Sequence, residues 1–138
     1  MAGSFSDFLE NEVLDHVFGG AAYTAPATIY AAACTAAVSD SNTGTTITEC
    51  DYTSYARVAI TNNATNFPAA SGGAKANGTA ITFPTSTGGA DDTVTYIALC
   101  DAATNGNLLG WADLDASKVV GVGDTLEIAI GDLDITLA

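Results

Sequence analysis

The residue types that most catalytic and metal sites require are scarce in this chain. It holds one histidine, His16, and three cysteines, Cys34, Cys50 and Cys100. His16 and its neighbour Asp15 are adjacent on an expected helix, where adjacent side chains point in different directions, and no Gly-x-Ser-x-Gly turn is present. The cysteines form no Cys-x-x-Cys pair, so they predict neither a zinc site nor a disulfide framework. We expect no catalytic residue, metal ligand or cofactor, and we interpret Cys34 and Cys100 as small buried hydrophobic residues.

Aspartate dominates the charged residues, so calcium binding and glycoside hydrolysis have to be considered. Asp101, Asn105 and Gly106 occupy the first, fifth and sixth places of an EF-hand loop, but alanine occupies the third and twelfth. The segment also lies between expected strands, so we interpret it as a hairpin that turns at Asn105 and Gly106. Calcium binding by another acidic loop stays open. No feature selects one aspartate pair for cleaving sugars.

The charge balance excludes one class of partner. The 138 residues include 16 acidic and 3 basic side chains, for a net charge of −13. Because so few cations cannot neutralise a run of phosphates, we expect no nucleic-acid partner and no membrane partner. No stretch reaches the roughly 18 to 20 apolar residues of a membrane span, and the acidic N-terminus is unlike a secretory signal. Since only 14% of residues are charged, we expect apolar contacts that survive high salt.

One amphipathic helix is expected at the start of the chain. Apolar residues recur there at three- and four-residue spacing, acidic residues fill most of the other side, and Gly19-Gly20 ends the pattern. Ser4 or Ser6 is the expected N-cap. We interpret residues 1–20 as a helical docking arm whose apolar side chains are buried either in the protein's own core or in an interface. These docking residues are Phe5, Phe8, Leu9, Val13 and Val17.

After Gly20 the sequence is typical of short strands. Runs rich in Val, Ile, Thr and Tyr alternate with turn residues, and the expected strands are 28–35, 45–49, 55–61, 79–83, 93–100, 108–114, 118–122, 125–130 and 133–137. Without a second helical pattern they cannot form a parallel sheet. We predict a mainly β fold, an antiparallel sandwich of about eight strands over residues 21–138, jelly-roll or immunoglobulin-like, or else a small barrel. The helix would then be an appendage or a plug, and Trp111 a core or interface aromatic residue.

Several segments, spread over nearly the whole chain, together indicate a resemblance to a known family. They are the opening helix through 20, 23–30, the Gly-Thr-Thr-Ile-Thr-Glu segment at 44–49, 55–59, 81–84, the Asp-Ala-Ala-Thr-Asn-Gly-Asn hairpin within 99–109, and Gly-Asp-Thr-Leu at 123–126. With these segments the chain resembles a family of small virion proteins of tailed bacteriophages, described as capsid-decoration (cement) or tail-fibre-like proteins.

The resemblance implies a non-enzymatic structural virion protein, made in the host cytoplasm. Its first implied role is capsid decoration, in which the chain binds the major capsid protein at the capsid surface and stabilises the head. The alternative is a tail-fibre or receptor-binding module that recognises the host surface. A small carbohydrate-active enzyme or lectin is a third hypothesis. A homo-oligomer, such as a trimer, is expected because repeated weak contacts add up to high avidity.

Overall fold

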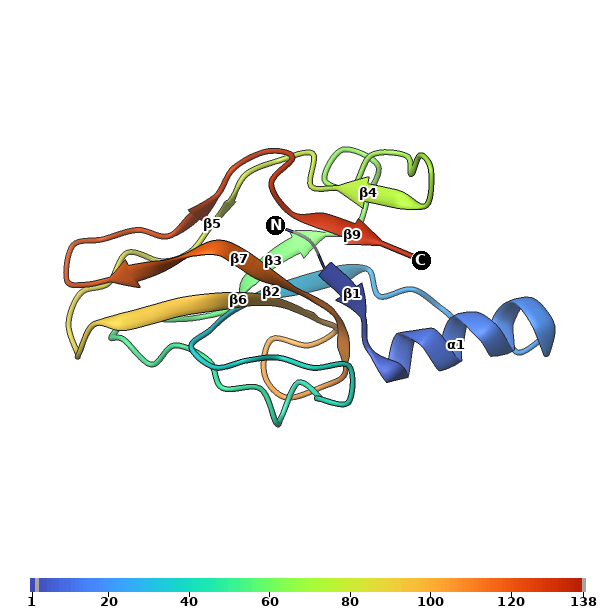
Figure 1. Cartoon of the computed structure of the whole chain (residues 1–138), viewed down its shortest axis with the longest axis horizontal. Coiled ribbons are helices and arrows are strands. Elements are labelled where there is room, and N and C mark those ends of the chain that lie inside the picture. Colours follow the sequence, from blue (N-terminus) through green and yellow to red (C-terminus); the bar gives the residue numbers. More distant parts are fainter. Residues whose placement is uncertain (2, 138) are drawn as a thin grey trace.

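The computed structural model describes residues 1 and 3–137, which form a mainly β, sandwich-like fold with one N-terminal helix (Figure 1). Its main layer is a five-stranded antiparallel sheet in the order β1-β7-β6-β2-β3, and two ribbons, β4-β9 and β5-β8, lie over one face of that sheet. The fold class predicted from the sequence is confirmed. The elements are β1 (Gly3–Phe5), α1 (Asp7–Phe18), β2 (Thr28–Cys34), β3 (Val58–Thr61), β4 (Ala74–Ala76), β5 (Ile81–Thr82), β6 (Asp92–Cys100), β7 (Leu108–Val120), β8 (Glu127–Ile128) and β9 (Asp134–Thr136).

Strand β2 explains why the chain is rich in alanine. Its last four residues, Ala31 to Cys34, are fully buried, because the strand is covered on both faces. Ala31 and Ala33 face the main core between the layers, whereas Ala32 and Cys34 face a smaller cluster on the other side. Loop residues Val38 and Ile47 close that cluster. Small side chains let the loops approach the sheet closely, so the alanines of β2 are explained by packing on both faces of the strand.

Several elements differ from the predicted ones, and strands β3, β5 and β8 are shorter than predicted. The predicted strands 108–114 and 118–122 merge into one strand, β7, which pairs with β6 with a register shift at two places. The predicted strand 45–49 reduces to an isolated bridge between Cys34 and Glu49. Strand β4 lies between the predicted strands 55–61 and 79–83, where no strand is predicted. At the N-terminus, Phe5 belongs to β1 and not to the helix.

The helix begins at a buried serine. The Ser6 hydroxyl accepts a hydrogen bond from the Leu9 amide at 3.3 Å and donates to the Leu108 carbonyl, while the Ser6 amide donates to the Leu109 carbonyl at 3.0 Å. Of the two serines considered as the cap, Ser6 is therefore the one used. The helix ends where the Gly19 amide donates to the Asp15 carbonyl at 2.9 Å. In the described residues, no helix combines the length and apolar character that crossing a bilayer requires.

Candidate docking surface

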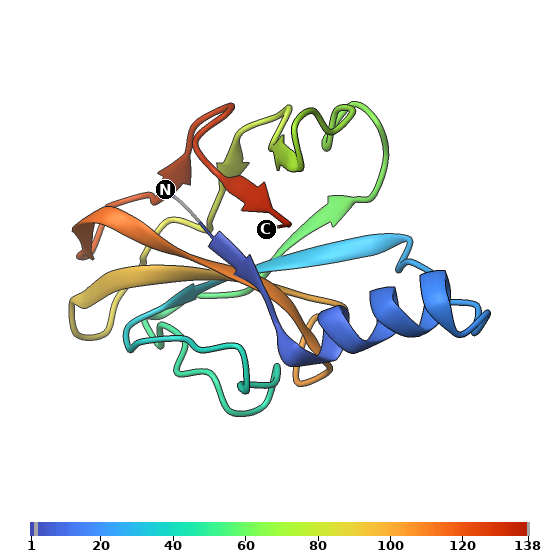
Figure 2. The same cartoon turned by 45° about the vertical axis from the view of Figure 1, so that its right-hand side comes forward.

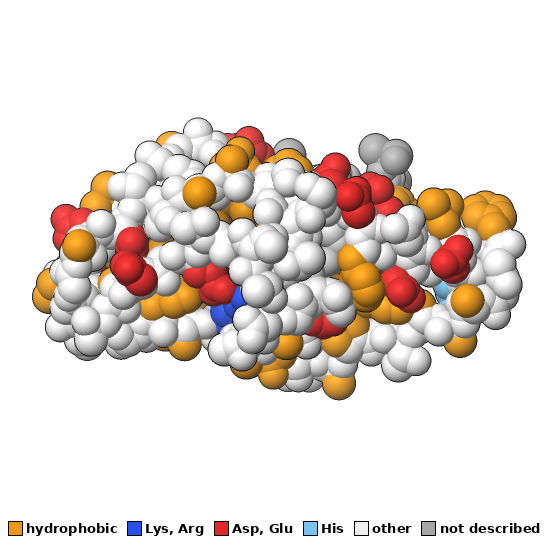
Figure 3. Space-filling model, turned by 90° about the horizontal axis from the view of Figure 1, so that it is seen from below, with side chains coloured by type: hydrophobic (Ala, Val, Ile, Leu, Met, Phe, Trp, Pro, Cys, Tyr) orange, Lys and Arg blue, Asp and Glu red, His pale blue; other side chains and the backbone are white. Residues whose placement is uncertain are grey.

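Helix α1 projects from the edge of the main sheet with an apolar tip. In Figures 1 and 2 the helix leaves the sheet at β1 and extends away from the body of the molecule. Leu14, Val17 and Phe18 are 54%, 60% and 83% exposed, and their spacing of three and four residues places them on one side of the helix. Figure 3 shows hydrophobic side chains at this end of the molecule, with acidic side chains beside them. We call Leu14, Val17 and Phe18 the helix tip.

The predicted docking residues lie along the inner part of the same helix and on β1. Phe8, Leu9 and Val13 are half-buried, Val17 is exposed, and none of the twelve residues of α1 is fully buried. Phe5 is half-buried on β1, beside the start of the helix. The structure thus brings Phe5 and Leu9 together at the base of α1, while Val17 belongs to the exposed tip.

Phe5 and Leu9 line an apolar crevice at the base of α1. The crevice has a volume of about 180 Å³, and Ile29, Phe67, Leu109 and Ile135 also line it. Lys75 and Asn62 are its polar neighbours, and the Lys75 ammonium group donates to the Phe67 carbonyl at 3.3 Å. Gly110 forms part of the wall where β1 pairs with β7, and a Cβ atom there would lie 2.9 Å from the Ser4 carbonyl oxygen. We call this the base crevice.

Trp111 lies on the face of the main sheet that bears the smaller cluster, opposite to the main core. Its ring is 5.8 Å from that of Tyr96, and its indole N–H donates to the Asp40 carboxylate at 2.8 Å. The residue is half-buried and packs against the smaller cluster that contains Ala98 and Leu108. In this chain Trp111 therefore fixes the loop that carries Asp40 to the sheet.

A second surface is formed by loops that Arg57 holds together. The guanidinium group, 3% exposed, donates to both Glu49 carboxylate oxygens, with its shortest contact at 2.6 Å. It also donates to the carbonyl oxygens of Gly44 at 2.7 Å, Ala102 at 2.8 Å and Asn105 at 2.9 Å. One side chain thereby joins the segment around 44–49 to the 101–107 hairpin. Beside it the loops surround an open basin of about 580 Å³.

Tyr55 also belongs to this hydrogen-bond network. Its hydroxyl group donates to Glu49 at 2.6 Å and accepts from the Ala33 amide at 3.1 Å. Burial, together with the hydrogen bond to Glu49, raises the pKa of the Tyr55 hydroxyl well above its usual value. For Arg57, burial acts to lower the pKa, but the hydrogen bonds to Glu49 and the electrostatic attraction of Cys100, Glu49 and Tyr55 together outweigh it, so the pKa is raised overall. Both side chains keep their protons at all ordinary pH values, so the network is fixed.

The hairpin interpretation of residues 101–107 is confirmed. The Asp101 carboxylate accepts from the Asn107 amide at 2.7 Å and from its side chain at 2.8 Å, and Asn105 and Gly106 have φ of +54° and +74°. Asp101 thus holds the two ends of the turn together.

Across residues 1 and 3–137, no three His, Cys, Asp or Glu side chains are grouped so that they could hold a metal ion. Sequence reasoning missed Arg57, although its being the single arginine was a visible signal.

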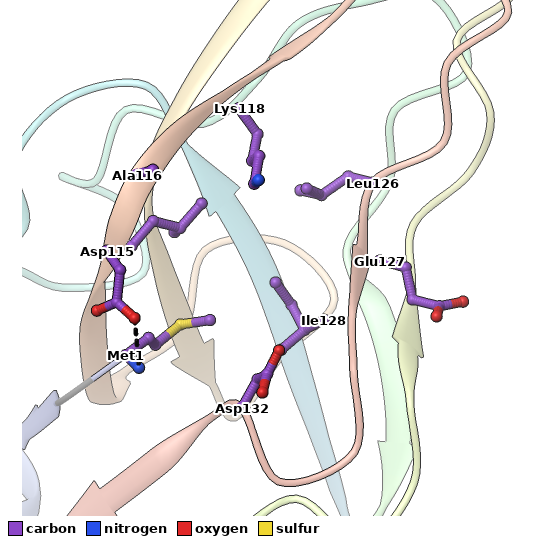
Figure 4. Close-up of a pocket in the computed structure, with 9 residues that line it drawn as sticks. Met1, Asp115, Ala116, Lys118, Leu126, Glu127, Ile128 and Asp132 are labelled. Carbon is purple, nitrogen blue, oxygen red and sulfur yellow. Dashed lines mark ion pairs between the residues drawn. The ribbon is translucent and has the colours of Figure 1, made fainter.

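A third hollow, of about 250 Å³, lies between β7 and the segment 126–132 (Figure 4). Met1, Leu126 and Ile128 supply apolar surface, and Lys118 and Asp132 add opposite charges. The Met1 ammonium group is 3.6 Å from the Asp115 carboxylate, which is 90% exposed, so this ion pair contributes little. Glu127 points away from the hollow and accepts from the Thr82 hydroxyl at 3.0 Å. The mixed charges do not converge on one point, so this hollow selects no ligand class.

Comparison with known proteins decides the family. A family model described as podophage GP4 fiber I protein gp80 matches residues 4–136. The chain belongs to this podophage fibre family. No curated protein matches the chain. The expected resemblance to tailed-phage virion proteins is confirmed, and the chain is a structural phage protein.

In this member of the podophage fibre family, the matched region includes the helix and the two loop and crevice surfaces described above, whereas Met1 of the third hollow lies outside it. It spans α1, the base crevice and the Arg57 network, from β1 to β9. His16, which lies in the matched region, fixes the chain that follows the end of the helix, since its Nδ1 atom accepts a hydrogen bond from the Tyr23 amide at 3.2 Å. Within this region the apolar surfaces are the projecting helix tip and the crevice at the base of the same helix.

Proposed function

We propose that this chain is a non-enzymatic subunit of a podophage fibre, attached to its neighbours through α1 and the base crevice. The observation that carries the proposal is the match to the fibre family over residues 4–136. The projecting helix supports it, because exposed apolar surface that is rimmed by polar residues marks an interaction site. This proposal favours the fibre role over decoration of the capsid, for which the partner would be the major capsid protein.

The non-enzymatic part of the proposal is supported by the way the ionisable groups are used. Glu49 pairs with Arg57, and Asp101 closes a hairpin. Asp92 accepts hydrogen bonds from two successive backbone amides, those of Asp51 at 2.9 Å and Tyr52 at 3.0 Å. Each of these groups stabilises a loop, whereas catalytic groups are held in a cleft with their proton-transfer positions free.

We assign contact with the host surface to the loops around the Arg57 basin. Binding residues are often found on loops that a rigid scaffold positions, and Arg57 fixes two such loops to each other and to Glu49. The purified chain should then compete with intact phage for adsorption to host cells. A chain whose loop residues Thr45 and Thr104 are both replaced by lysine should compete less well, while Val122→Lys, on an exposed turn elsewhere, should compete like the wild type.

Immunogold labelling of intact virions tests the fibre role directly. An antibody raised against the purified chain should label fibres and leave the head surface unlabelled. Labelling spread over the head would contradict the proposal and support capsid decoration. In that case virions that lack the chain should also lose thermal stability of the head, which a fibre subunit would not affect.

A further inference from the structure

The helix tip and the base crevice belong to the same chain but cannot meet within it. Phe18 is nine residues beyond Leu9, which lines the crevice, so about 14 Å of rigid helix separates them. The tip points away from the body of the molecule (Figures 1 and 2). Each copy therefore carries an apolar projection and an apolar hollow, and each of them lacks a counterpart within its own chain.

The two surfaces match in size. The base crevice has a volume of about 180 Å³. A dry apolar cavity of roughly 150 Å³ holds one benzene ring, so the crevice fits one phenyl side chain. Phe18 is 83% exposed, more than any other large hydrophobic side chain described. Burying one aromatic side chain removes about 150 to 250 Å² of surface from water, which makes Phe18 the strongest anchor available on α1.

The two surfaces also match in charge. The helix carries Asp7, Glu10, Glu12 and Asp15 and neither lysine nor arginine. Asp15 precedes Phe18 by three residues, so the two side chains lie on neighbouring parts of the helix surface. The base crevice has at its edge Lys75, one of only three cationic residues in the chain. An acidic helix that inserts Phe18 into the crevice would therefore bring a carboxylate toward Lys75.

We propose that the occupant of the base crevice is Phe18 of a second copy of this chain, with Asp15 of that copy beside Lys75. This inference deepens the proposed fibre role, since it names the contact through which copies associate. If two copies insert their tips into each other, the contact closes into a dimer. If the copies insert head to tail, the contact continues into a longer assembly, because each added copy leaves one tip free.

Sedimentation equilibrium and light scattering on the full chain test the proposal. We expect the wild type to self-associate as its concentration rises. Phe18→Ser should weaken association by about tenfold or more, because truncating a central aromatic anchor commonly has that effect. Val122→Ser is the matched control, since Val122 is 65% exposed and lies away from both surfaces. It should associate like the wild type, and all variants should have the wild-type circular dichroism spectrum.

A charge exchange provides the second arm. Lys75→Glu should weaken association by about threefold, as is typical of a pair at the rim of an interface. Adding Asp15→Lys to the same chain should restore it, because the opposite charges then meet again in reversed order. Failure of the double variant to recover would overturn the placement of Asp15 beside Lys75.

Three results would overturn the inference as a whole. One is a wild-type chain that stays monomeric at every concentration, and another is equal association of Phe18→Ser and Val122→Ser. The third is a monomeric chain whose Phe18→Ser form is lost from virions, which would assign the tip to a different virion protein. These results are distinguishable from failure of the fibre role, because immunogold labelling reports position on the virion whatever the state of association.

Discussion

At the scale of single residues, Arg57 organises the loop end of the sandwich. A guanidinium group has five N–H donors, and here they reach the Glu49 carboxylate and three backbone carbonyl oxygens. A lysine at this position could supply only three donors from a single point. The neighbouring carboxylate is 22% exposed, so it would lose its main partner while still largely out of water if the arginine were removed.

Replacing this arginine should therefore destabilise the fold strongly. We expect Arg57→Ala to lower the free energy of unfolding by about 3 kcal/mol, because an uncompensated and mostly buried charge is left behind. Urea denaturation followed by tyrosine and tryptophan fluorescence measures this change. Lys118→Ala, which removes an exposed cation, is the control and should stay within about 0.5 kcal/mol of the wild type. A loss below about 1 kcal/mol for Arg57→Ala would show that the loops hold their positions without the network.

At the scale of elements, the attachment of α1 depends on its N-cap residue, Ser6. Ser6 is fully buried and connects the helix to both Leu108 and Leu109 of β7 while it also caps the helix. The cap thus does two things at once: it satisfies an amide of the first helical turn and fixes the direction in which the helix leaves the sheet.

Removing the cap should loosen the helix before it unfolds the sheet. We expect Ser6→Ala to lower stability by about 1 to 2 kcal/mol and to speed amide hydrogen exchange in α1 more than in β6. Ser4→Ala is a close control, because the Ser4 hydroxyl contacts only the carbonyl of the next residue. Equal exchange in α1 for the two variants would contradict the role assigned to Ser6.

The elements also show how far the sequence could predict the structure. The helix, its end at Gly19 and the long strands around residues 28–34 and 92–100 were predictable, because each has a local periodicity. Strand β1 was not, since three residues gain strand geometry only by pairing with β7. Strand β4 depends in the same way on β9, which is about sixty residues away in the chain. A local sequence pattern therefore predicts a long element, whereas a short strand forms only where the fold supplies a pairing partner.

The same limit applies to the candidate site. Phe5 and Leu9 were singled out by their spacing, but the crevice that they line also needs Ile29, Phe67 and Ile135. Those residues come from distant parts of the chain, so only the folded topology brings them together. Phe18 was overlooked because it lies outside the predicted apolar stripe, and its exposure follows from the direction in which the helix projects.

At the scale of the whole molecule, the three cysteines make stability depend on alkaline pH. Burial raises the pKa of Cys34 and of Cys50 to about 12 and that of Cys100 to about 11. In the unfolded chain thiols ionise near pH 8.5. Because the folded state holds these protons more tightly, the stabilisation is complete below about pH 8.5 and is lost progressively between there and about pH 12.

We expect the free energy of unfolding to fall as the pH rises above about 9. Each thiol contributes up to about 1.4 kcal/mol per pH unit where the unfolded form is ionised and the folded form is not. Cys34→Ala should reduce this slope while it lowers stability at neutral pH, where the thiol is uncharged in both states. Denaturant titrations at pH 7, 9 and 10 separate the two effects. An unchanged slope in Cys34→Ala would mean that other groups cause the alkaline loss.

The net charge of the chain affects how strongly its copies associate. Two chains of charge −13 repel one another in dilute salt, and added salt screens that repulsion over distances beyond about 10 Å. Since the proposed contact is mainly apolar, we expect self-association to strengthen when sodium chloride is raised from low to moderate concentration. Sedimentation at several salt concentrations measures this trend. Weakening with added salt would assign the contact to the acidic residues instead of the helix tip.

The scarcity of lysine and arginine also affects how readily proteases cleave the chain. Trypsin cuts after these residues, and the chain has three of them. Arg57 is held in its network, Lys75 is half-buried on β4, and Lys118 lies within β7. A protease needs an extended, freely moving segment, and none of the three cationic residues lies on one. The folded chain should therefore persist intact in surroundings rich in trypsin-like enzymes, with cleavage limited by the rate at which its strands open.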